Sequence, residues 1–252
     1  MRPRTTYKKL FKNSFKKSYA GDWLDFGYYF VSEVMNVYPF ARLNRKYLVC
    51  PLCDKSEDHF FHLGNKLGIS WHAACPNCDS RSRHRGLIFL YNLYLNRSDQ
   101  IRILHFAPEK SFLSYFSNIE PHHYNTTDLN MDGVDFPCED IQCLRFDDCS
   151  YDLVLANHVL EHVENDGLAL SEVARILSRN GKAIFTIPGD WRRVETKIFP
   201  NLDFNGHYRD YGLDIIDLMK TVFSQVKVCN LFQFNGIKHA IKKDEIAFIC
   251  IK

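Results

Sequence analysis

The sequence predicts an α/β fold in which a doubly wound, mostly parallel sheet follows a small cysteine-containing module. From Ile101 onward, short apolar strands alternate with helical patterns, and strands joined by crossover helices form parallel sheets. Ahead of that region, two Cys-x-x-Cys pairs mark a separate module. We therefore expect a basic, aromatic-rich helical segment, a cysteine module and a sheet domain, in that order, at residues 1–46, 47–85 and 86–252.

Composition limits the class of protein. A chain of 252 residues with 46% hydrophobic content can bury the core of one α/β domain with a small module attached. Its net charge of +2, from 32 basic and 30 acidic residues, gives no overall field that would favour nucleic acid. The nine cysteines are an odd number without a secretory pattern, which favours a reducing cytoplasm. No run approaches the ~18 apolar residues that cross a bilayer, so we expect a cytoplasmic protein, soluble or at most peripheral.

The first 20 residues carry seven basic side chains and no acidic one, with Tyr, Phe and Leu at near-helical spacing. One interpretation is a solvated tail whose aromatic side chains pack on the main domain. The other is a basic amphipathic helix that makes peripheral contact with an anionic membrane or with a phosphate-bearing substrate. A helix is then expected over Asp22 to Asn36, with Asp22 as its N-cap and an aromatic face that favours packing.

The two Cys-x-x-Cys pairs form the most specific motif. They are separated by 21 residues (54–74), one beyond the usual spacing of a four-cysteine zinc site. Each pair turns two thiolates toward one point, and Zn²⁺ accepts four in a closed tetrahedron. Free core thiols or a redox pair are the alternatives, but a redox motif has no reason to be duplicated. We expect structural zinc on Cys50, Cys53, Cys75 and Cys78, and packing or surface positions for His59, His62 and His72 between them.

A basic cluster at Arg81–Arg85 directly follows the second pair and leads into a helical pattern that ends at Leu95. The cluster could meet a phosphate or a carboxylate. Solvated or intramolecular ion pairs at the start of a helix explain it equally well.

The sheet domain opens with a strand at Ile101–His105, a turn at Phe106–Pro108 and a helix at Glu109–Phe116. A second strand, His123–Thr127, leads into Asp128, and an apolar strand at Tyr151–Ala156 stops at Asn157. In a parallel sheet, ligands bind outside the carboxyl ends of the strands. We therefore expect the ligand crevice beside the residues that follow these strands.

The remaining elements are predicted in order along the chain. Asn165 starts a helix that runs through Ser178 and stops at Asn180–Gly181. A fifth strand, a polar loop, a helix and two closing strands follow at Gly181–Pro188, Gly206–Gly212, Leu213–Phe223, Gln225–Phe232 and Glu245–Ile251.

From Ile101 to Lys252 this order of elements resembles the class I S-adenosylmethionine-dependent methyltransferases. The resemblance includes the acidic strand end at Asp128 and two further segments, Glu139-Asp140-Ile141 and Asn157-His158-Val159-Leu160-Glu161-His162. The resemblance implies a seven-stranded, Rossmann-like sheet whose last two strands form an antiparallel hairpin, with the final strand beside the fifth. One feature departs from the family. The first turn is usually glycine-rich, whereas here Ala107, Glu109 and Ser111 stand at those positions, and His105 stands where an acidic residue is usual.

The resemblance also implies binding roles for the residues at the carboxyl ends of the strands. The residues at the first turn would face the amino acid end of S-adenosyl-L-methionine, with Glu109 at its ammonium: His105, Phe106, Ala107, Pro108 and Glu109. Asp128 would accept from the ribose hydroxyls, Asp140 from the adenine amino group, Ile141 would pack on the adenine ring, and Asn157 would border the transferring methyl group. Turn or cap chemistry is the alternative for Asp128 and Asp140.

A hydroxyl or amine acceptor must lose one proton as the methyl group arrives. His158 is the first candidate base, because histidine titrates in the right range and stands at the switch from strand to helix. His207 in the later loop is the second. We expect Glu161 and His162 to cap the helix or orient the backbone, and the same capping role is the alternative for His158.

Together these features predict an S-adenosylmethionine-dependent methyltransferase with a structural Zn²⁺ and a small-molecule or saccharide acceptor, membrane- or lipid-linked if the basic N-terminus takes part. An RNA methyltransferase is the alternative enzyme, because some methyltransferases that act on ribosomal RNA carry an N-terminal zinc module. A zinc-ribbon adaptor with a degenerate cofactor fold is the alternative outside enzymes.

Overall fold

The computed structural model describes residues 23–37, 47–65, 68–95, 100–117 and 123–252. They form two compact units, one of residues up to Ile88 together with Phe232–Lys243, the other of Phe89–Leu231 with Asp244–Lys252. The basic segment 1–20 and the proposed cap Asp22 lie outside the described residues. The three domain ranges given above remain predictions.

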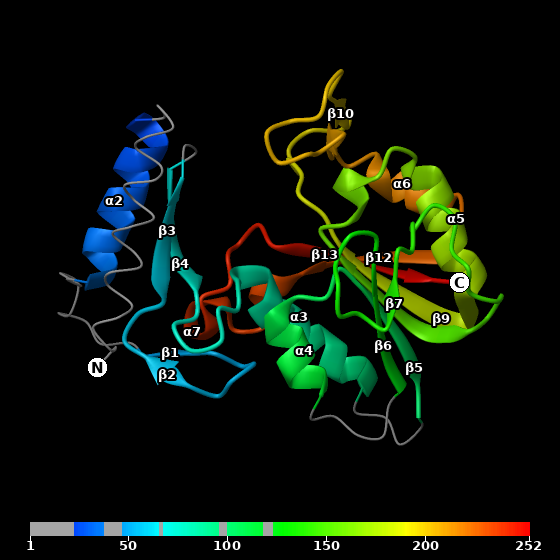
Figure 1. The fold of residues 1–252 in the computed structure, drawn as a ribbon, viewed down its shortest axis with the longest axis horizontal. Helices are drawn as coiled ribbons and strands as arrows, with labels where there is room; N and C mark the ends of the chain where they lie inside the picture. The colour runs from blue at the N-terminus through cyan, green and yellow to red at the C-terminus, as the bar shows by residue number, and fades with distance from the viewer. Residues whose placement is uncertain (1–22, 38–46, 66–67, 96–99, 118–122) are drawn as a thin grey trace. The chain divides into compact units, whose positions relative to one another are not determined.

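The first unit contains helix α2 (Trp23–Val37), the hairpin of β1 (Leu48–Val49) and β2 (Ser56–Glu57), the hairpin of β3 (Phe61–Asn65) and β4 (Gly68–Ala74), the start of α3 (Ser82–Leu95) and the short helix α7 (Gly236–His239), all labelled in Figure 1. The Asn36 side chain of α2 pairs with the backbone of His62, accepting from its N–H at 2.7 Å and donating to its carbonyl at 2.9 Å. At Gly64 a Cβ would meet the Tyr28 carbonyl at less than van der Waals distance, so this contact between helix and strand requires glycine.

The second unit is built on a seven-stranded sheet of order β12-β13-β9-β8-β5-β6-β7. The strands are β5 (Arg102–Phe106), β6 (His123–Asp128), β7 (Phe136–Pro137), β8 (Tyr151–Asn157), β9 (Leu177–Thr186), β12 (Gln225–Asn230) and β13 (Ile246–Ile251). All neighbours are parallel except β13, which is antiparallel to both β12 and β9. The predicted doubly wound, mostly parallel sheet, with its final strand beside the fifth, is confirmed.

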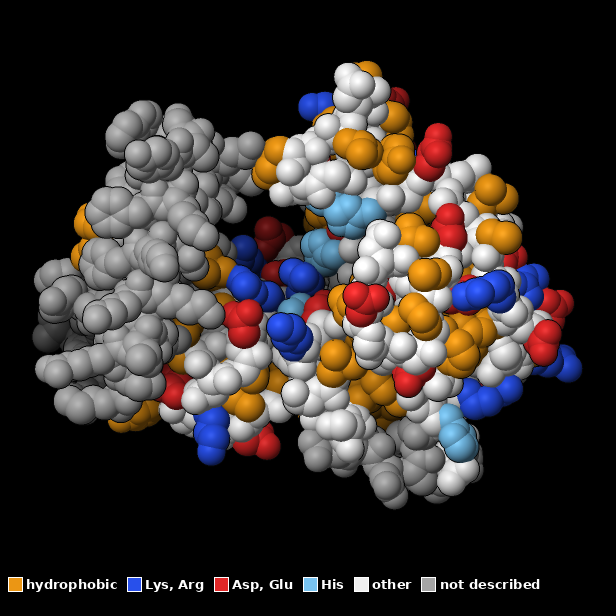
Figure 2. Space-filling view, in the orientation of Figure 1, with side chains coloured by type: hydrophobic (Ala, Val, Ile, Leu, Met, Phe, Trp, Pro, Cys, Tyr) orange, Lys and Arg blue, Asp and Glu red, His pale blue; other side chains and the backbone are white. Residues whose placement is uncertain are grey.

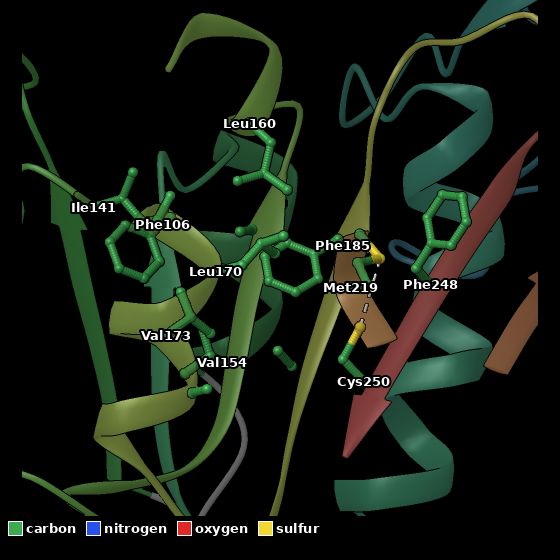
Figure 3. Close-up of a cluster of buried hydrophobic side chains, with 14 of the residues drawn as sticks. Phe106, Ile141, Val154, Leu160, Leu170, Val173, Phe185, Met219, Phe248 and Cys250 are labelled. Carbon is green, nitrogen blue, oxygen red and sulfur yellow. Dashed lines mark hydrogen bonds between the residues drawn. The ribbon is translucent and has the colours of Figure 1, made fainter. Parts of the chain in front are cut away.

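Further short elements connect or cover these strands: α4 (Lys110–Phe116), η1 (Leu160–His162), α5 (Asp166–Ile176), β10 (Lys197–Ile198), β11 (Arg209–Asp210), α6 (Ile215–Lys220) and η2 (Leu231–Gln233). Successive strand residues point to opposite faces of a sheet. On one face α5 and α6 bury the apolar cluster drawn in Figure 3, which includes Phe106, Val154, Leu170, Val173, Phe185 and Met219. On the other face the Phe112 ring lies 5.2 Å from Tyr91 and 5.8 Å from His105, between ring centroids.

The chain after β8 is less helical than the sequence predicts. His158 has a positive φ of 54°. In the described residues 158–165, the helical part is limited to the 3₁₀ turn η1. A helix begins at Asp166, close to the predicted start, and the Asn165 side chain caps it by accepting from the Leu168 N–H.

The predicted helix end at Ser178 and strand start at Gly181 are also displaced. α5 ends at Ile176, and β9 begins at once, with Leu177 paired to Tyr151. The register then shifts, because residues 178–181 bulge out around Asn180, whose φ is 62°. Among the described residues, no helix has the length and apolar character needed to span a membrane.

Candidate functional site

The order of the strands reverses at β5. The chain continues from β5 to β6 on one side, whereas β8 lies on the other side, and all three are parallel. Such a reversal places a binding crevice outside the carboxyl ends of the two strands beside it. The predicted turn after β5 and the residues that follow β8 therefore share one edge of the sheet.

Two residues at this edge have a left-handed backbone without being glycine. Ala107 has a φ of 47°, and its N–H donates to the Thr127 carbonyl at 2.9 Å. His158 has a φ of 54°, and its N–H donates to the Thr186 carbonyl at 2.7 Å. Such strained conformations cluster at functional sites. The first turn thus keeps the conformation that glycine would favour, although alanine occupies the position.

A buried polar cluster lies below the same edge. Asn157 is 3% exposed, and its amide accepts from the Tyr91 hydroxyl at 3.0 Å and donates to Glu109 Oε2 at 3.2 Å. His105 is fully buried, with Nδ1 2.8 Å from the Tyr124 hydroxyl and Nε2 3.4 Å from Glu109 Oε2. Burial raises the pKa of Tyr124, so its hydroxyl stays neutral. The Glu109 side chain is 17% exposed, so it is not sealed inside this cluster, and its contact with a ligand remains a prediction.

The two predicted aspartates both make turn contacts. Asp128 Oδ1 accepts from the N–H groups of Asn130 and Met131, each at 2.7 Å. Asp140 Oδ1 accepts from the Gln142 N–H at 2.9 Å. Turn chemistry therefore accounts for one oxygen of Asp128 and does not compete with binding by the other.

The apolar candidates of the edge lie inside the molecule. Phe106 is 2% exposed and Ile141 is 4% exposed, and both belong to the cluster in Figure 3. Pro108 is also buried. Any contact of these three with a cofactor remains a prediction.

The structure brings His207 next to the residues that follow β8. The rings of His162 and His207 lie 4.8 Å apart between centroids at an interplanar angle of 69°. His158 Nδ1 lies 2.9 Å from Glu161 Oε1. Figure 2 shows histidine side chains gathered on this face of the second unit, beneath the segment that carries β10.

Two buried residues that the sequence did not single out hold this arrangement. Arg209 forms an ion pair with Asp166 at 3.1 Å and donates to the Glu164 carbonyl at 2.6 Å. The Tyr211 hydroxyl lies 3.2 Å from the Leu160 carbonyl and 3.1 Å from Asp166 Oδ2. Through these contacts Arg209 and Tyr211 connect the segment after His207 to the turn η1 and the start of α5. The sequence signals no more than a polar loop there, because its partners lie more than 40 residues away.

In the first unit, the four predicted cysteine ligands converge. Their Sγ atoms all lie within 4.8 Å of one another, with 3.6 Å between Cys50 and Cys78 and 3.8 Å between Cys53 and Cys75. A tetrahedron with Zn–S bonds of about 2.3 Å has S···S edges of about 3.8 Å, so this thiol set fits Zn²⁺.

The two cysteine turns have the same backbone. In each, the first cysteine N–H donates to a carbonyl five residues later, Lys55 or Ser80, and its own carbonyl accepts from the N–H four residues later. Asp54 and Asp79 occupy matching left-handed positions, with φ of 53° and 57°. Of the intervening histidines, His62 is buried, and its Nδ1 accepts from the His72 N–H at 3.0 Å, which supports the predicted packing role.

The basic cluster after the second cysteine turn includes one structural arginine. Arg85 is fully buried and donates to backbone carbonyls, including Ser80 at 2.5 Å, His239 at 2.7 Å and Ala240 at 2.7 Å. Its guanidinium also lies 4.7 Å from the centre of the Phe60 ring. Arg85 therefore joins the cysteine module to residues 239–240 of the same unit.

Comparison with known proteins agrees with this description. A family model described as a methyltransferase domain matches residues 109–185. The solved 1,6-didemethyltoxoflavin-N1-methyltransferase of Burkholderia thailandensis, with bound S-adenosylhomocysteine, is 12% identical, with a TM-score of 0.50 over 68% of this chain and 78% of that one. The CMeT domain of the citrinin polyketide synthase is 14% identical, with a TM-score of 0.49 over 71% and 54%. The phosphoethanolamine N-methyltransferase 2 of Haemonchus contortus is 13% identical, with a TM-score of 0.47 over 74% and 55%. No curated protein sequence matches the chain.

Proposed function

We propose that the chain is a class I S-adenosylmethionine-dependent methyltransferase that methylates a hydroxyl group of a small-molecule or glycan-type acceptor, in line with the methyltransferase-domain model that matches residues 109–185. The cofactor supplies an activated methyl group on a sulfonium. The protein must position the acceptor and remove its proton.

One pair of side chains carries the proposal. His158 follows Asn157 at the carboxyl end of β8, and its Nδ1 lies 2.9 Å from Glu161 Oε1. The side chain is 31% exposed, whereas Glu161 is fully buried. A carboxylate close to one imidazole nitrogen leaves the other nitrogen to accept a proton, as in a general base, and a small rotation of the His158 ring would align its Nδ1–H with Glu161. In this proposal His158 is the base, and His207, 16% exposed and paired with Asp203, is the alternative.

Cofactor contacts are assigned to the same edge. The partly exposed Glu109 faces the ammonium of S-adenosyl-L-methionine, and the second oxygen of Asp128 accepts from the ribose hydroxyls. His105 and Asn157 keep Glu109 in place from below. The four cysteines hold a structural Zn²⁺, because a closed set of four thiolates has no open position for catalysis.

The test is methyl transfer from isotopically labelled S-adenosyl-L-methionine to separate panels of hydroxylated small molecules, saccharides and RNA. We expect label on a hydroxyl acceptor, and we expect His158→Asn to lower turnover by roughly 10²- to 10⁴-fold, as for a lost general base. S-adenosylhomocysteine affinity should stay unchanged. The matched control is His123→Asn, because His123 is exposed at the opposite, amino end of β6.

Three results would contradict the proposal. Turnover of His158→Asn within a few-fold of wild type would remove His158 as the base and move attention to His207. Label found on RNA alone, with affinity that falls steeply with salt, would support the RNA alternative. Lack of S-adenosylhomocysteine binding by the folded protein would support a non-catalytic adaptor.

A further inference from the structure

Glu161 is a buried carboxylate in an unusual environment. Its side chain has no solvent exposure, and neither of its oxygens accepts a hydrogen bond of good geometry from the described residues. The contact with His158 Nδ1 at 2.9 Å is made by Oε1 and does not involve Oε2. Burial of an ionised carboxylate is costly unless it is paired and hydrogen-bonded or coordinates a metal. A divalent metal ion would supply a partner of this kind to Glu161.

In each of the two neighbouring histidines, His162 and His207, one ring nitrogen lies close to an oxygen atom of the protein. His162 Nδ1 lies 3.1 Å from the Gly206 carbonyl, and His207 Nδ1 lies 3.3 Å from Asp203 Oδ2. A carbonyl or carboxylate at Nδ1 keeps the proton on that nitrogen and leaves Nε2 as the electron-pair donor. Histidines that bind metals are oriented by this kind of contact.

These three side chains converge on one point. Glu161, His162 and His207 each offer a donor atom, and the three donor atoms lie within 4.8 Å of one another. Ligands at about 2.1 Å from a metal are separated by about 3.0–3.4 Å, so side-chain movements of about 1 Å close the site. We propose that Glu161, His162 and His207 bind a divalent transition-metal ion.

The donor set defines the kind of ion. Two imidazoles and a carboxylate suit first-row transition metals and zinc, whereas Mg²⁺ and Ca²⁺ prefer oxygen ligands throughout. His162 lies at the surface, so the coordination positions not filled by protein face solvent. Three protein ligands with open positions are typical of a catalytic metal site, in contrast to the closed set of four cysteines.

The backbone holds the ligands together before a metal binds. Tyr208, next to His207, donates its N–H to the Glu161 carbonyl at 2.8 Å. Arg209 and Tyr211 join the same segment to Leu160 and Asp166, as described above. Such supporting contacts preorganise a site. If the proposed function is correct, on which this role depends, the open positions hold an oxygen of the acceptor near His158.

The experiment adds Co²⁺ to the full-length protein with zinc already bound, and measures bound metal by equilibrium dialysis and visible absorption. We expect one Co²⁺ per chain, with ligand-field bands and no thiolate charge-transfer band. His162→Ala and His207→Ala should each weaken Co²⁺ binding by more than tenfold, and Asp203→Asn by about 10- to 100-fold, as for other outer-sphere partners. His123→Ala is the matched control and should bind as wild type does.

Glu161→Gln should also lose Co²⁺, but it alters a buried group, so the exposed His162 provides the variant least able to disturb the fold. Failure of the wild type to bind Co²⁺ outside the cysteines would overturn the proposal, as would unchanged binding in both histidine variants. S-adenosylhomocysteine titration of the same samples separates the two proposals. Co²⁺ bound with no S-adenosylhomocysteine affinity would overturn the proposed function and leave the metal site standing.

Discussion

Replacement of Asp128 separates its role in the turn from its proposed role in cofactor binding. Oδ1 accepts from two backbone N–H groups at 2.7 Å, while the other oxygen is assigned to the ribose. Asp128→Asn keeps an acceptor for the turn and removes the charge, whereas Asp128→Ala removes both. Hydrogen bonds to a charged group contribute about 1.5–3 kcal/mol, and neutral ones about 0.5–1.5 kcal/mol. In Asp128→Asn the amide oxygen stays with the turn and the NH₂ group, which is no acceptor, faces the ribose, so we expect a loss of about 1.5–3 kcal/mol in binding and little loss of stability.

In affinity, 1.5–3 kcal/mol is a factor of about 10 to 150, since 1.4 kcal/mol corresponds to tenfold. Calorimetric titration with S-adenosylhomocysteine should show this loss in both variants. Thermal unfolding should show Asp128→Asn melting with wild type, and Asp128→Ala losing about 1–3 kcal/mol from its two turn contacts. Wild-type affinity in Asp128→Asn would refute the assignment and leave Asp128 as a turn residue.

Two further predictions concern the metal and pH. Cys50→Ser or Cys78→Ser should release the structural zinc and unfold the first unit, because folding of such modules is coupled to metal binding; metal analysis checks this, and a folded, zinc-free wild type with reduced thiols would disprove it. In the second unit, hydrogen bonds from Arg102 lower the pKa of Asp152 from 3.8 to about 2. A carboxyl group whose pKa is lower in the folded state than in the unfolded state stabilises the fold at pH values above the unfolded pKa. This stabilisation is lost as the pH falls from about 4 toward 2. Because the Asp152 and Arg102 side chains are 30% and 45% exposed, Asp152→Asn should cost less than about 1 kcal/mol at pH 7. Urea unfolding should show that the difference in unfolding free energy between wild type and Asp152→Asn shrinks below pH 4. A difference that stays constant with pH would mean that the loss of stability comes from packing and not from the charge.

Local patterns were sufficient for most of the sheet and for the cysteine site. The apolar runs of β5, β8 and β9 are buried strands, as predicted, although their bounds differ by a few residues from the predicted ones. The cysteine pairs could be assigned because spacing alone brings two thiols of each pair together. The meeting of the two pairs is not a local feature, and it was predicted because Zn²⁺ accepts four thiolates.

The histidine cluster depends on distant segments and was only partly predicted. His158 and His207 were singled out by residue type, whereas Glu161 and His162 were expected to cap a helix or orient the backbone. The left-handed backbone of His158 is followed by the short turn η1 and not by a regular helix, and His162 Nδ1 lies 3.1 Å from the Gly206 carbonyl. The path of residues 203–211 over this turn is set by contacts such as Tyr208 to Glu161, 47 residues apart in sequence, which no local pattern reveals.

The most direct test of the account is a crystal structure of the protein with S-adenosylhomocysteine. We expect the ribose at Asp128, the ammonium at Glu109 and the sulfur facing His158 across the carboxyl ends of β5 and β8. A ligand bound elsewhere, or density for these side chains without a ligand at saturating concentration, would contradict it.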